Sequence, residues 1–127
     1  MTLSLPRQGE SYRGPITDTR RWTNFQHRPD DIFVCTPPKC GTTWTQAICA
    51  SLVFGTAAHG VRPGSISLWL AAAVAPIEER LQQAEAQSHR RFFKTHTPFD
   101  GIPYFPACTY FVIFRDPRDV YFSVLNH

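Results

Sequence analysis

The chain has 127 residues, of which 43% are hydrophobic and 13% aromatic, and its formal net charge is +3. This composition predicts one globular domain with a modest core and excludes a low-complexity or disordered polypeptide. The positive charge is too small, and its blocks of like charge too short, to predict a nucleic-acid-binding surface. No stretch is apolar enough for a transmembrane segment or a secretory leader, so we expect a cytoplasmic protein.

The four cysteines have neither C-x-x-C spacing nor a paired set of histidines: Cys35, Cys40, Cys49 and Cys108. Such spacing argues against a zinc site and a disulfide framework. We therefore expect reduced thiols and no metal ion.

Residues 1–30 are rich in Arg, Pro, Thr and Gly and contain the scattered aromatic residues Tyr12, Trp22 and Phe25. This pattern predicts a partly ordered lead-in segment that packs on the domain through its rings. The domain itself is predicted to occupy residues 31–127.

The first predicted unit of the domain is a strand, a tight loop and a helix. Residues 32–36 form a short apolar run that ends at two prolines, which is typical of a buried parallel strand. Apolar and small residues then recur at helical spacing up to a C-cap at Gly55, at Trp44, Ala47, Ile48, Ser51 and Leu52. Residues 56–65 read as a loop, and residues 68–74 as a helical turn.

The second half of the chain repeats the alternation of helix and strand. Pro76 suits the first position of a helix that runs to about Gln87. Residues 91–95 and 109–114 are strand candidates, and Asp116 is placed to cap a helix that begins at Pro117. Strands that alternate with helices predict an α/β fold with a parallel central sheet, whose ligands bind at the carboxyl ends of the strands.

The loop between the first strand and its helix, Cys35-Thr-Pro-Pro-Lys-Cys-Gly-Thr-Thr-Trp44, carries a lysine, a glycine and two threonines. Free N–H groups at a helix start, a glycine and a lysine together suit a tetrahedral anion. In a Walker-type ATP loop the lysine follows the second glycine, whereas Lys39 precedes Gly41. A P-loop nucleotide kinase is therefore the alternative rather than the leading interpretation, since no Mg²⁺-binding acid is evident either.

This loop resembles the 5′-phosphosulfate loop of the cytosolic-type sulfotransferases, which usually reads Tyr-Pro-Lys-Ser-Gly-Thr-Thr-Trp. Two later stretches resemble other motifs of that family in the same order. Residues 91–98 contain Lys-Thr-His-Thr-Pro, similar to the segment with the catalytic histidine, and residues 110–123 are similar to the 3′-phosphate motif. The segment from Ser67 to His89 looks like that of actinobacterial members. The resemblance implies the N-terminal portion of a P-loop-like, three-layer sulfotransferase fold.

The resemblance also implies a role for each motif residue. The donor would be 3′-phosphoadenosine-5′-phosphosulfate (PAPS), and its product PAP. His96 would be the catalytic base, with Lys39 stabilising the leaving group and Lys94 holding the sulfuryl oxygens. The remaining residues implied in binding the nucleotide are Cys40, Gly41, Thr42, Thr43 and Trp44 at the 5′ end and at the adenine, and Arg115 and Ser123 at the 3′-phosphate.

Each of these residues also has a purely structural interpretation. Lys39 and Lys94 could be solvated lysines, and His96 could be a satisfied polar group at a strand end. Arg115 could pair with Asp116 or Asp119, and Trp44 could belong to the core. Cys40 replaces the serine that is usual in the family. Its thiol is only a weak hydrogen-bond donor, but its backbone N–H can still bind the ligand.

The expected function is sulfuryl transfer from PAPS to a hydroxyl or amine of a small or lipid-like acceptor, with a glycolipid favoured by the actinobacterial resemblance. Residues 101–106 and 56–75 are expected to line the acceptor entrance with apolar groups. The family's domain extends beyond the equivalent of His127, into a region that completes the nucleotide site and carries its dimer motif. An inactive nucleotide-binding fragment is therefore a further alternative, and a homodimer would form through that later region.

Overall fold

Three parallel strands form the centre of the protein. The computed structural model describes residues 9–127, so residues 1–8 of the predicted lead-in lie outside the described residues. The strands are β1 (Ile32–Cys35), β2 (Phe92–Thr95) and β3 (Thr109–Val112), in the order β2-β1-β3. Both neighbours pair with β1 in parallel, so the carboxyl ends of all three strands lie at one edge.

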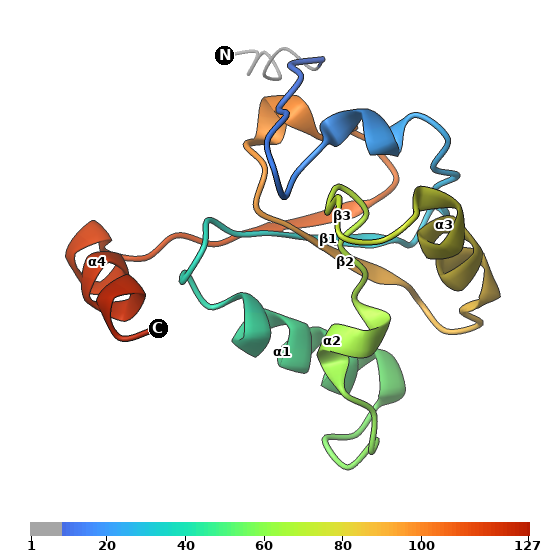
Figure 1. The fold of residues 1–127 in the computed structure, drawn as a ribbon. Helices are drawn as coiled ribbons and strands as arrows, with labels where there is room; N and C mark the ends of the chain where they lie inside the picture. Colours follow the sequence, from blue (N-terminus) through green and yellow to red (C-terminus); the bar gives the residue numbers. More distant parts are fainter. Residues whose placement is uncertain (1–8) are drawn as a thin grey trace, which may run out of the picture.

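Helical segments cover both faces of this sheet. Figure 1 shows α1 and α2 below the sheet, residues 9–30 with η1 above it, η2 also above it, and α4 beyond the carboxyl ends of the strands. The segments are η1 (Thr19–Trp22), α1 (Thr42–Phe54), α2 (Pro63–Ile66), α3 (Ile77–Ala86), η2 (Phe99–Gly101) and α4 (Pro117–Leu125). The predicted α/β class, with a parallel sheet flanked by helices, is confirmed.

The core lies in two layers because side chains alternate along β1. Ile32 and Val34 pack with Cys49 and Ala50 of α1 on one face of the sheet. Phe33 and Cys35 point to the other face, into a larger aromatic cluster. That cluster also contains Trp22 and Phe25 from the lead-in, Phe93 from β2 and Ala84 from α3. The prediction that the lead-in packs through its rings is thus confirmed for Trp22 and Phe25.

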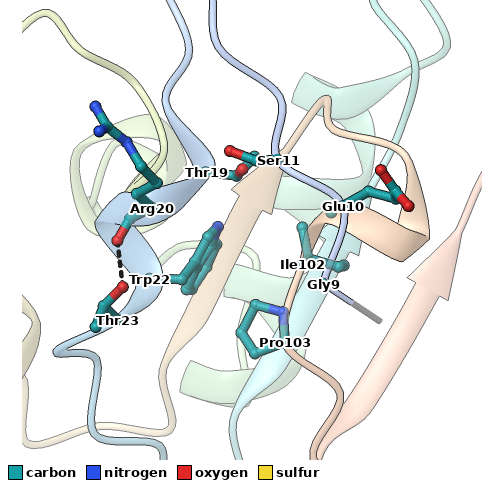
Figure 2. Close-up of a pocket in the computed structure, with 10 residues that line it drawn as sticks. Gly9, Glu10, Ser11, Thr19, Arg20, Trp22, Thr23, Ile102 and Pro103 are labelled. Atoms are coloured by element: carbon teal, nitrogen blue, oxygen red, sulfur yellow. Dashed lines mark hydrogen bonds between the residues drawn. The ribbon is translucent and has the colours of Figure 1, made fainter. Parts of the chain in front are cut away.

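The lead-in also contacts the loop that follows β2. The hydroxyl of Tyr12 donates to Asp100 Oδ1 at 2.9 Å, and the backbone N–H of Gly9 donates to the carbonyl of Asp100 at 3.0 Å. The same part of the chain encloses a cavity of about 300 Å³, seen in Figure 2, with Trp22 and Ile102 in its walls. This cavity shares no lining residue with the functional site described below.

The close contact between the lead-in and η2 predicts that Gly101 tolerates no side chain. A Cβ atom at Gly101 would meet the ring of Tyr12 and lie 2.8 Å from Thr97 Cγ2. Such overpacking typically costs about 1–3 kcal/mol, so Gly101→Ala should lower the free energy of unfolding by that amount. Urea denaturation measures the effect, with Gly14→Ala as control because a Cβ there meets nothing within 4 Å. Equal stability of the two variants would contradict the prediction.

The predicted helical turn at residues 68–74 is present only as a single turn, in which the N–H of Ala72 donates to the carbonyl of Trp69 at 3.2 Å. No helix forms in this segment, which lies between β2 and the lead-in, because several of its backbone carbonyls bind distant partners. Lys94 N–H donates to the carbonyl of Leu68, and the Arg21 guanidinium donates to the carbonyls of Leu70 and Ala75. A short helix, α2, occupies part of the region that was predicted to be loop.

The orientation of α1 also differs from the pattern in the sequence. The predicted apolar stripe is exposed: Trp44, Ile48 and Leu52 are 78%, 56% and 72% accessible. The buried face instead contains Thr45, Gln46, Cys49 and Ala50. Thr45 enters the interior because its hydroxyl donates to the carbonyl of Gly41 at 3.0 Å, which satisfies the polar group. The predicted C-cap at Gly55 is confirmed, with φ of 70°.

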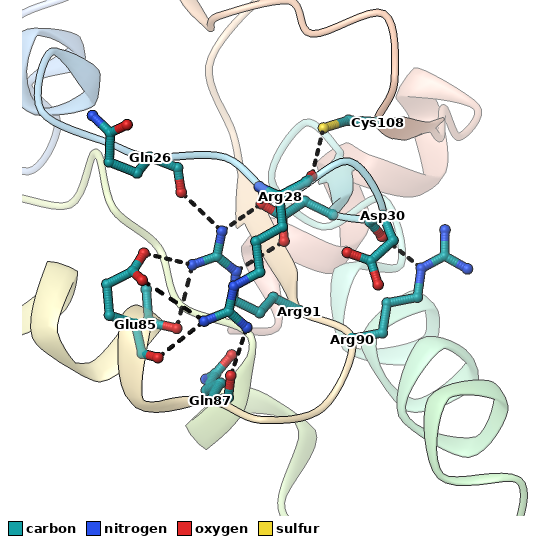
Figure 3. Close-up of polar contacts among 10 residues, drawn as sticks. Gln26, Arg28, Asp30, Glu85, Gln87, Arg90, Arg91 and Cys108 are labelled. Atoms are coloured by element: carbon teal, nitrogen blue, oxygen red, sulfur yellow. Dashed lines mark hydrogen bonds and ion pairs between the residues drawn. The ribbon is translucent and has the colours of Figure 1, made fainter.

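A buried ion pair joins the start of β2 to the start of β1. Arg91 and Asp31 have side chains that are fully inaccessible, with Arg91 Nη2 2.6 Å from Asp31 Oδ2 and Nε 2.8 Å from Oδ1. The guanidinium also donates to Glu85 of α3 and to the carbonyl of Gln26 in the lead-in. Figure 3 shows how these contacts, and those of neighbouring arginines, tie the starts of β1 and β2, α3 and the lead-in together.

Candidate active site

The loop after β1 is a tight turn with a lysine in a left-handed conformation. The N–H of Cys40 donates to the carbonyl of Pro37 at 3.3 Å, which closes a four-residue turn. Pro38 occupies the second position, which suits its fixed φ, and Lys39 occupies the third with φ of 63°. A non-glycine residue in this region is uncommon, and such conformations cluster at functional sites.

The helix that follows the turn has an open N-terminus. Gly41 is its N-cap with φ of 96°, a value that glycine adopts at no steric cost, and no side chain caps the helix. The hydroxyl of Thr42 is paired with that of Thr36 instead. The first-turn amides therefore have no side-chain acceptor within residues 9–127, and the positive end of the helix dipole faces the adjacent space.

A cavity of about 780 Å³ lies at this edge of the sheet and brings the predicted site residues together. Nine of the ten predicted site residues line it: Lys39, Gly41, Thr42, Thr43, Trp44, Lys94, His96, Arg115 and Ser123. Three separated motifs meet here because each follows the carboxyl end of a neighbouring parallel strand. The sequence predicted this convergence, because each motif follows a predicted parallel strand.

Cys40 is the exception among the ten. Its side chain is buried and does not line the cavity. Its backbone N–H, predicted as an alternative ligand-binding group, is already used by the carbonyl of Pro37. The residue thus contributes to the turn, and the structure gives its thiol no contact with the cavity.

All ionisable side chains that line the cavity are basic. They are Lys39, Lys94, His96, Arg115 and His127, and no carboxylate is among the lining residues. Together with the open helix N-terminus they make a strongly electropositive space, which suits a ligand with several phosphate or sulfate groups.

The imidazole of His96 is held in a single tautomer. Its Nδ1 lies 2.7 Å from the carbonyl oxygen of Thr36. Because a carbonyl can only accept, Nδ1 must carry hydrogen, and Nε2 keeps the free lone pair of a base. Burial lowers the pKa of His96, the hydrogen bond to Thr36 opposes this change, and the charge of Lys94 adds to the lowering. The lowered pKa favours the neutral imidazole.

Arg115 follows β3, and its side chain reaches back to the loop between β1 and α1. One of its guanidinium nitrogens donates to the carbonyl of Lys39 at 3.3 Å. Its contact with Asp119 is long, at 3.9 Å, and both side chains are exposed. Such an exposed ion pair contributes little, so the guanidinium remains available for an anion. The predicted cap at the start of α4 is confirmed, since Asp116 accepts from the N–H of Arg118.

Three residues that the sequence did not single out also belong to this site. Gln46 and His127 line the cavity, and Lys39 Nζ donates to His127 Nδ1 at 3.1 Å. Trp69 packs against both Lys94 and His96. No local pattern marks these residues, because only the tertiary fold brings them to the strand ends.

A second, apolar cavity of about 360 Å³ adjoins the first, and His96 lines both. Its walls are otherwise mainly apolar and come from the ends of all three strands and the segments that follow: Cys35, Thr36, Pro37, Thr97, Pro98, Phe99, Val112 and Phe114. Residues 101–106 and 56–75, predicted to line an acceptor entrance, do not contribute to it. The imidazole therefore stands between a basic cavity and an apolar one.

Within residues 9–127, no group of three or more His, Cys, Asp or Glu side chains could hold a metal ion. Over the same residues, every helix is too short or too polar to cross a membrane.

Comparisons with known proteins show the family of the chain. The profile of the sulfotransferase domain family matches residues 29–127. A glycolipid sulfotransferase of Mycobacterium tuberculosis is 41% identical over 90% of this chain and 35% of its own length. Cytosolic sulfotransferase 1 of Danio rerio is 37% identical over 67% of this chain and 31% of its own length. The chain belongs to the sulfotransferase family, as the three motifs predicted, and it spans about a third of the length of these relatives.

Proposed function

We propose that the protein carrying this chain transfers the sulfuryl group of PAPS to a hydroxyl of a lipid-like acceptor. The observation that carries the proposal is the convergence of Lys39, His96 and Arg115 on one cavity. Membership of the sulfotransferase family supports the type of reaction. The name of the mycobacterial relative, a glycolipid sulfotransferase, supports the type of acceptor.

The residues around the basic cavity fit a nucleotide that carries charge at both ends. Lys39 and the open N-terminus of α1 would hold the 5′ end, while Arg115 and Ser123 would hold the 3′-phosphate. Trp44, which is 78% exposed, presents an uncovered ring at the cavity that could stack on the adenine. PAPS supplies the activated sulfuryl group, and the cavity volume of about 780 Å³ is within the usual range for a ligand of this size.

The proton and the charge of the reaction would be handled by two groups. The acceptor hydroxyl would give its proton to Nε2 of His96 as its oxygen attacks, because Nδ1 is occupied by Thr36. The ammonium of Lys39 would neutralise the charge that develops on the leaving phosphate oxygen. Lys94 lines the same cavity and would hold the sulfuryl oxygens.

The apolar cavity is the best candidate for the acceptor side. An alcohol with an apolar body could bury it against Phe99 and Phe114 and present its hydroxyl to His96. This arrangement supports a lipid-like acceptor over a highly charged one, because the walls offer mainly apolar contact.

Nucleotide binding tests the donor half of this proposal. Replacing Lys39 with alanine should weaken PAP binding by about tenfold to a hundredfold, because a charge-assisted hydrogen bond contributes about 1.5–3 kcal/mol. Isothermal titration calorimetry of the purified protein measures the change. Arg62→Ala removes one positive charge outside the cavity and should leave the affinity unchanged.

The same titrations separate the remaining alternatives. Tighter binding of ATP with Mg²⁺ than of PAP would overturn the proposal in favour of the kinase, which receives no support from the comparisons. PAP binding without transfer from labelled PAPS to any glycolipid or apolar alcohol would favour a nucleotide-binding module instead. Transfer that requires His96 and Lys39 would support the enzyme.

A further inference from the structure

Trp69 lies against the two functional residues of the Lys-Thr-His motif. Lys94 Nζ is 5.3 Å from the centroid of its ring, which is the geometry of a cation–π contact. The ring centroid of His96 is 5.0 Å away, with the two planes at 81°, in an edge-to-face contact. One indole thus touches both the ammonium and the imidazole.

The position of this indole is fixed from two sides. The carbonyl of Leu68 accepts from the N–H of Lys94, which holds the preceding residue against β2. On the other side, Arg21 Nε donates to the carbonyl of Leu70 at 2.8 Å. The backbone around Trp69 is therefore bound both to the strand that carries the motif and to the lead-in.

The indole N–H of Trp69 does not explain the position of the ring. Trp69 Nε1 is buried and has no hydrogen-bond partner among the described residues. A buried donor without a partner is destabilising, by about 1–3 kcal/mol. The same holds for Trp22 in the aromatic core, so the two ring contacts, and not the indole N–H, distinguish Trp69.

We propose that Trp69 is a positioning residue of the active site, whose ring holds the Lys94 ammonium and the His96 imidazole so that both face the basic cavity. The proposal rests on the function proposed above. It adds a residue of the irregular segment between α2 and α3 to the catalytic arrangement. Lys94 has no carboxylate within ion-pair distance among the described residues, so the face of this ring is the contact that stabilises its charge.

The test follows the titration of His96, which requires no turnover. The groups that face His96 are Lys94 from β2 and the other basic residues of the cavity, Lys39, Arg115 and His127. Loss of the ring in Trp69→Met should expose the imidazole and release Lys94, so both main causes of the lowered pKa weaken. The pKa of His96 should rise toward its ordinary value in this variant. Trp69→Phe keeps a ring face and should leave the pKa near that of the parent protein.

NMR titration of the histidine ring protons measures this, with His96→Asn to assign the signal. Phe54→Met is the matched control, since Phe54 lies against His59 and His89, at 5.4 and 5.1 Å, and should not alter His96. An unchanged His96 pKa in Trp69→Met would overturn the proposal. So would a Trp69→Phe variant that fails to fold or that shifts His96 as much as methionine does.

Kinetics gives the second readout. In Trp69→Met the kcat should fall by about tenfold to a hundredfold while the affinity for PAP stays within about twofold, because misplaced groups affect the transition state more than ground-state binding. The acidic limb of the pH profile should move to higher pH with the His96 pKa. If the parent protein neither bound PAP nor transferred sulfate, the proposed function would be wrong. The His96 titration would still test whether Trp69 holds the imidazole.

Discussion

Replacing His96 with asparagine is expected to lower kcat for sulfuryl transfer by about a hundredfold to ten-thousandfold, the usual contribution of a positioned general base. Asparagine can keep the hydrogen bond to the carbonyl of Thr36 through its amide, so the loss would report on the missing base rather than on a disturbed loop. PAP affinity should change little, because the imidazole is proposed to act on the acceptor side. Transfer from labelled PAPS and calorimetric PAP binding are the two measurements.

A matched control for this variant exists outside the cavity. His89 also has its Nδ1 against a backbone carbonyl, that of Arg90 at 2.9 Å. His89→Asn should therefore retain full activity. If His96→Asn turned over as fast as the parent protein, His96 would not be the base, and the free lone pair on its Nε2 would need another explanation.

The pH dependence of the parent protein follows from the same geometry. Burial lowers the pKa of His96 below its ordinary value of 6.5, and the nearby charge of Lys94 acts in the same direction. A base must be deprotonated to act, and a lowered pKa keeps it deprotonated to lower pH. The acidic limb of kcat/KM should therefore fall below pH 6.5 and be absent in His96→Asn. An acidic limb well above that value would contradict the described burial.

Replacing Arg91 with methionine is expected to reduce the free energy of unfolding by about 3–5 kcal/mol, because it leaves the carboxylate of Asp31 buried without its partner. Both side chains are fully inaccessible, and the guanidinium lies 5.4 and 5.3 Å from the ring centroids of Phe25 and Phe93. A loss of this size is a large part of the stability of a small domain. Urea denaturation, followed by far-UV circular dichroism, measures it.

Two further variants test whether burial causes the loss of stability in Arg91→Met. Arg118 and Asp116 form a pair with similar geometry, 2.8 Å at the closest atoms, but they are 85% and 41% exposed. Arg118→Met should therefore change stability by no more than about 1 kcal/mol. The double change Asp31→Leu with Arg91→Met removes both charges and should recover much of the loss. Equal losses in Arg91→Met and Arg118→Met would show that the buried pair contributes no more than an exposed one.

The local sequence predicted the strands to within two residues. The apolar runs at 32–36, 91–95 and 109–114 became β1, β2 and β3, and the shorter observed strands reflect the usual uncertainty at element ends. The proline at position 76 caps α3 rather than opening it, a displacement of one residue. These elements could be predicted because short-range features, namely apolar runs and capping residues, decide them.

In two places, long-range contacts produce a structure that differs from the one that the local sequence pattern predicts. The alanine-rich segment 68–74 favours a helix by composition. It forms only one turn, because the carbonyls of Leu68 and Leu70 are taken by Lys94 and Arg21, which are distant in sequence. On α1, the stripe formed by Ile48 and Leu52 remains exposed because the helix turns Cys49 and Ala50 toward β1. Propensity and periodicity contain no information about which distant group will occupy a backbone carbonyl or a face.

The sequence by itself determined the family, the order of its three motifs and their convergence at one edge of the sheet, since each motif follows a parallel strand. Only the tertiary structure decided the left-handed Lys39, the free Nε2 of His96 and the placement of Trp69. The physical reason is that local patterns encode the alternation of strands and helices, which implies parallel strands, whereas the contacts that orient a side chain come from segments far away in the chain.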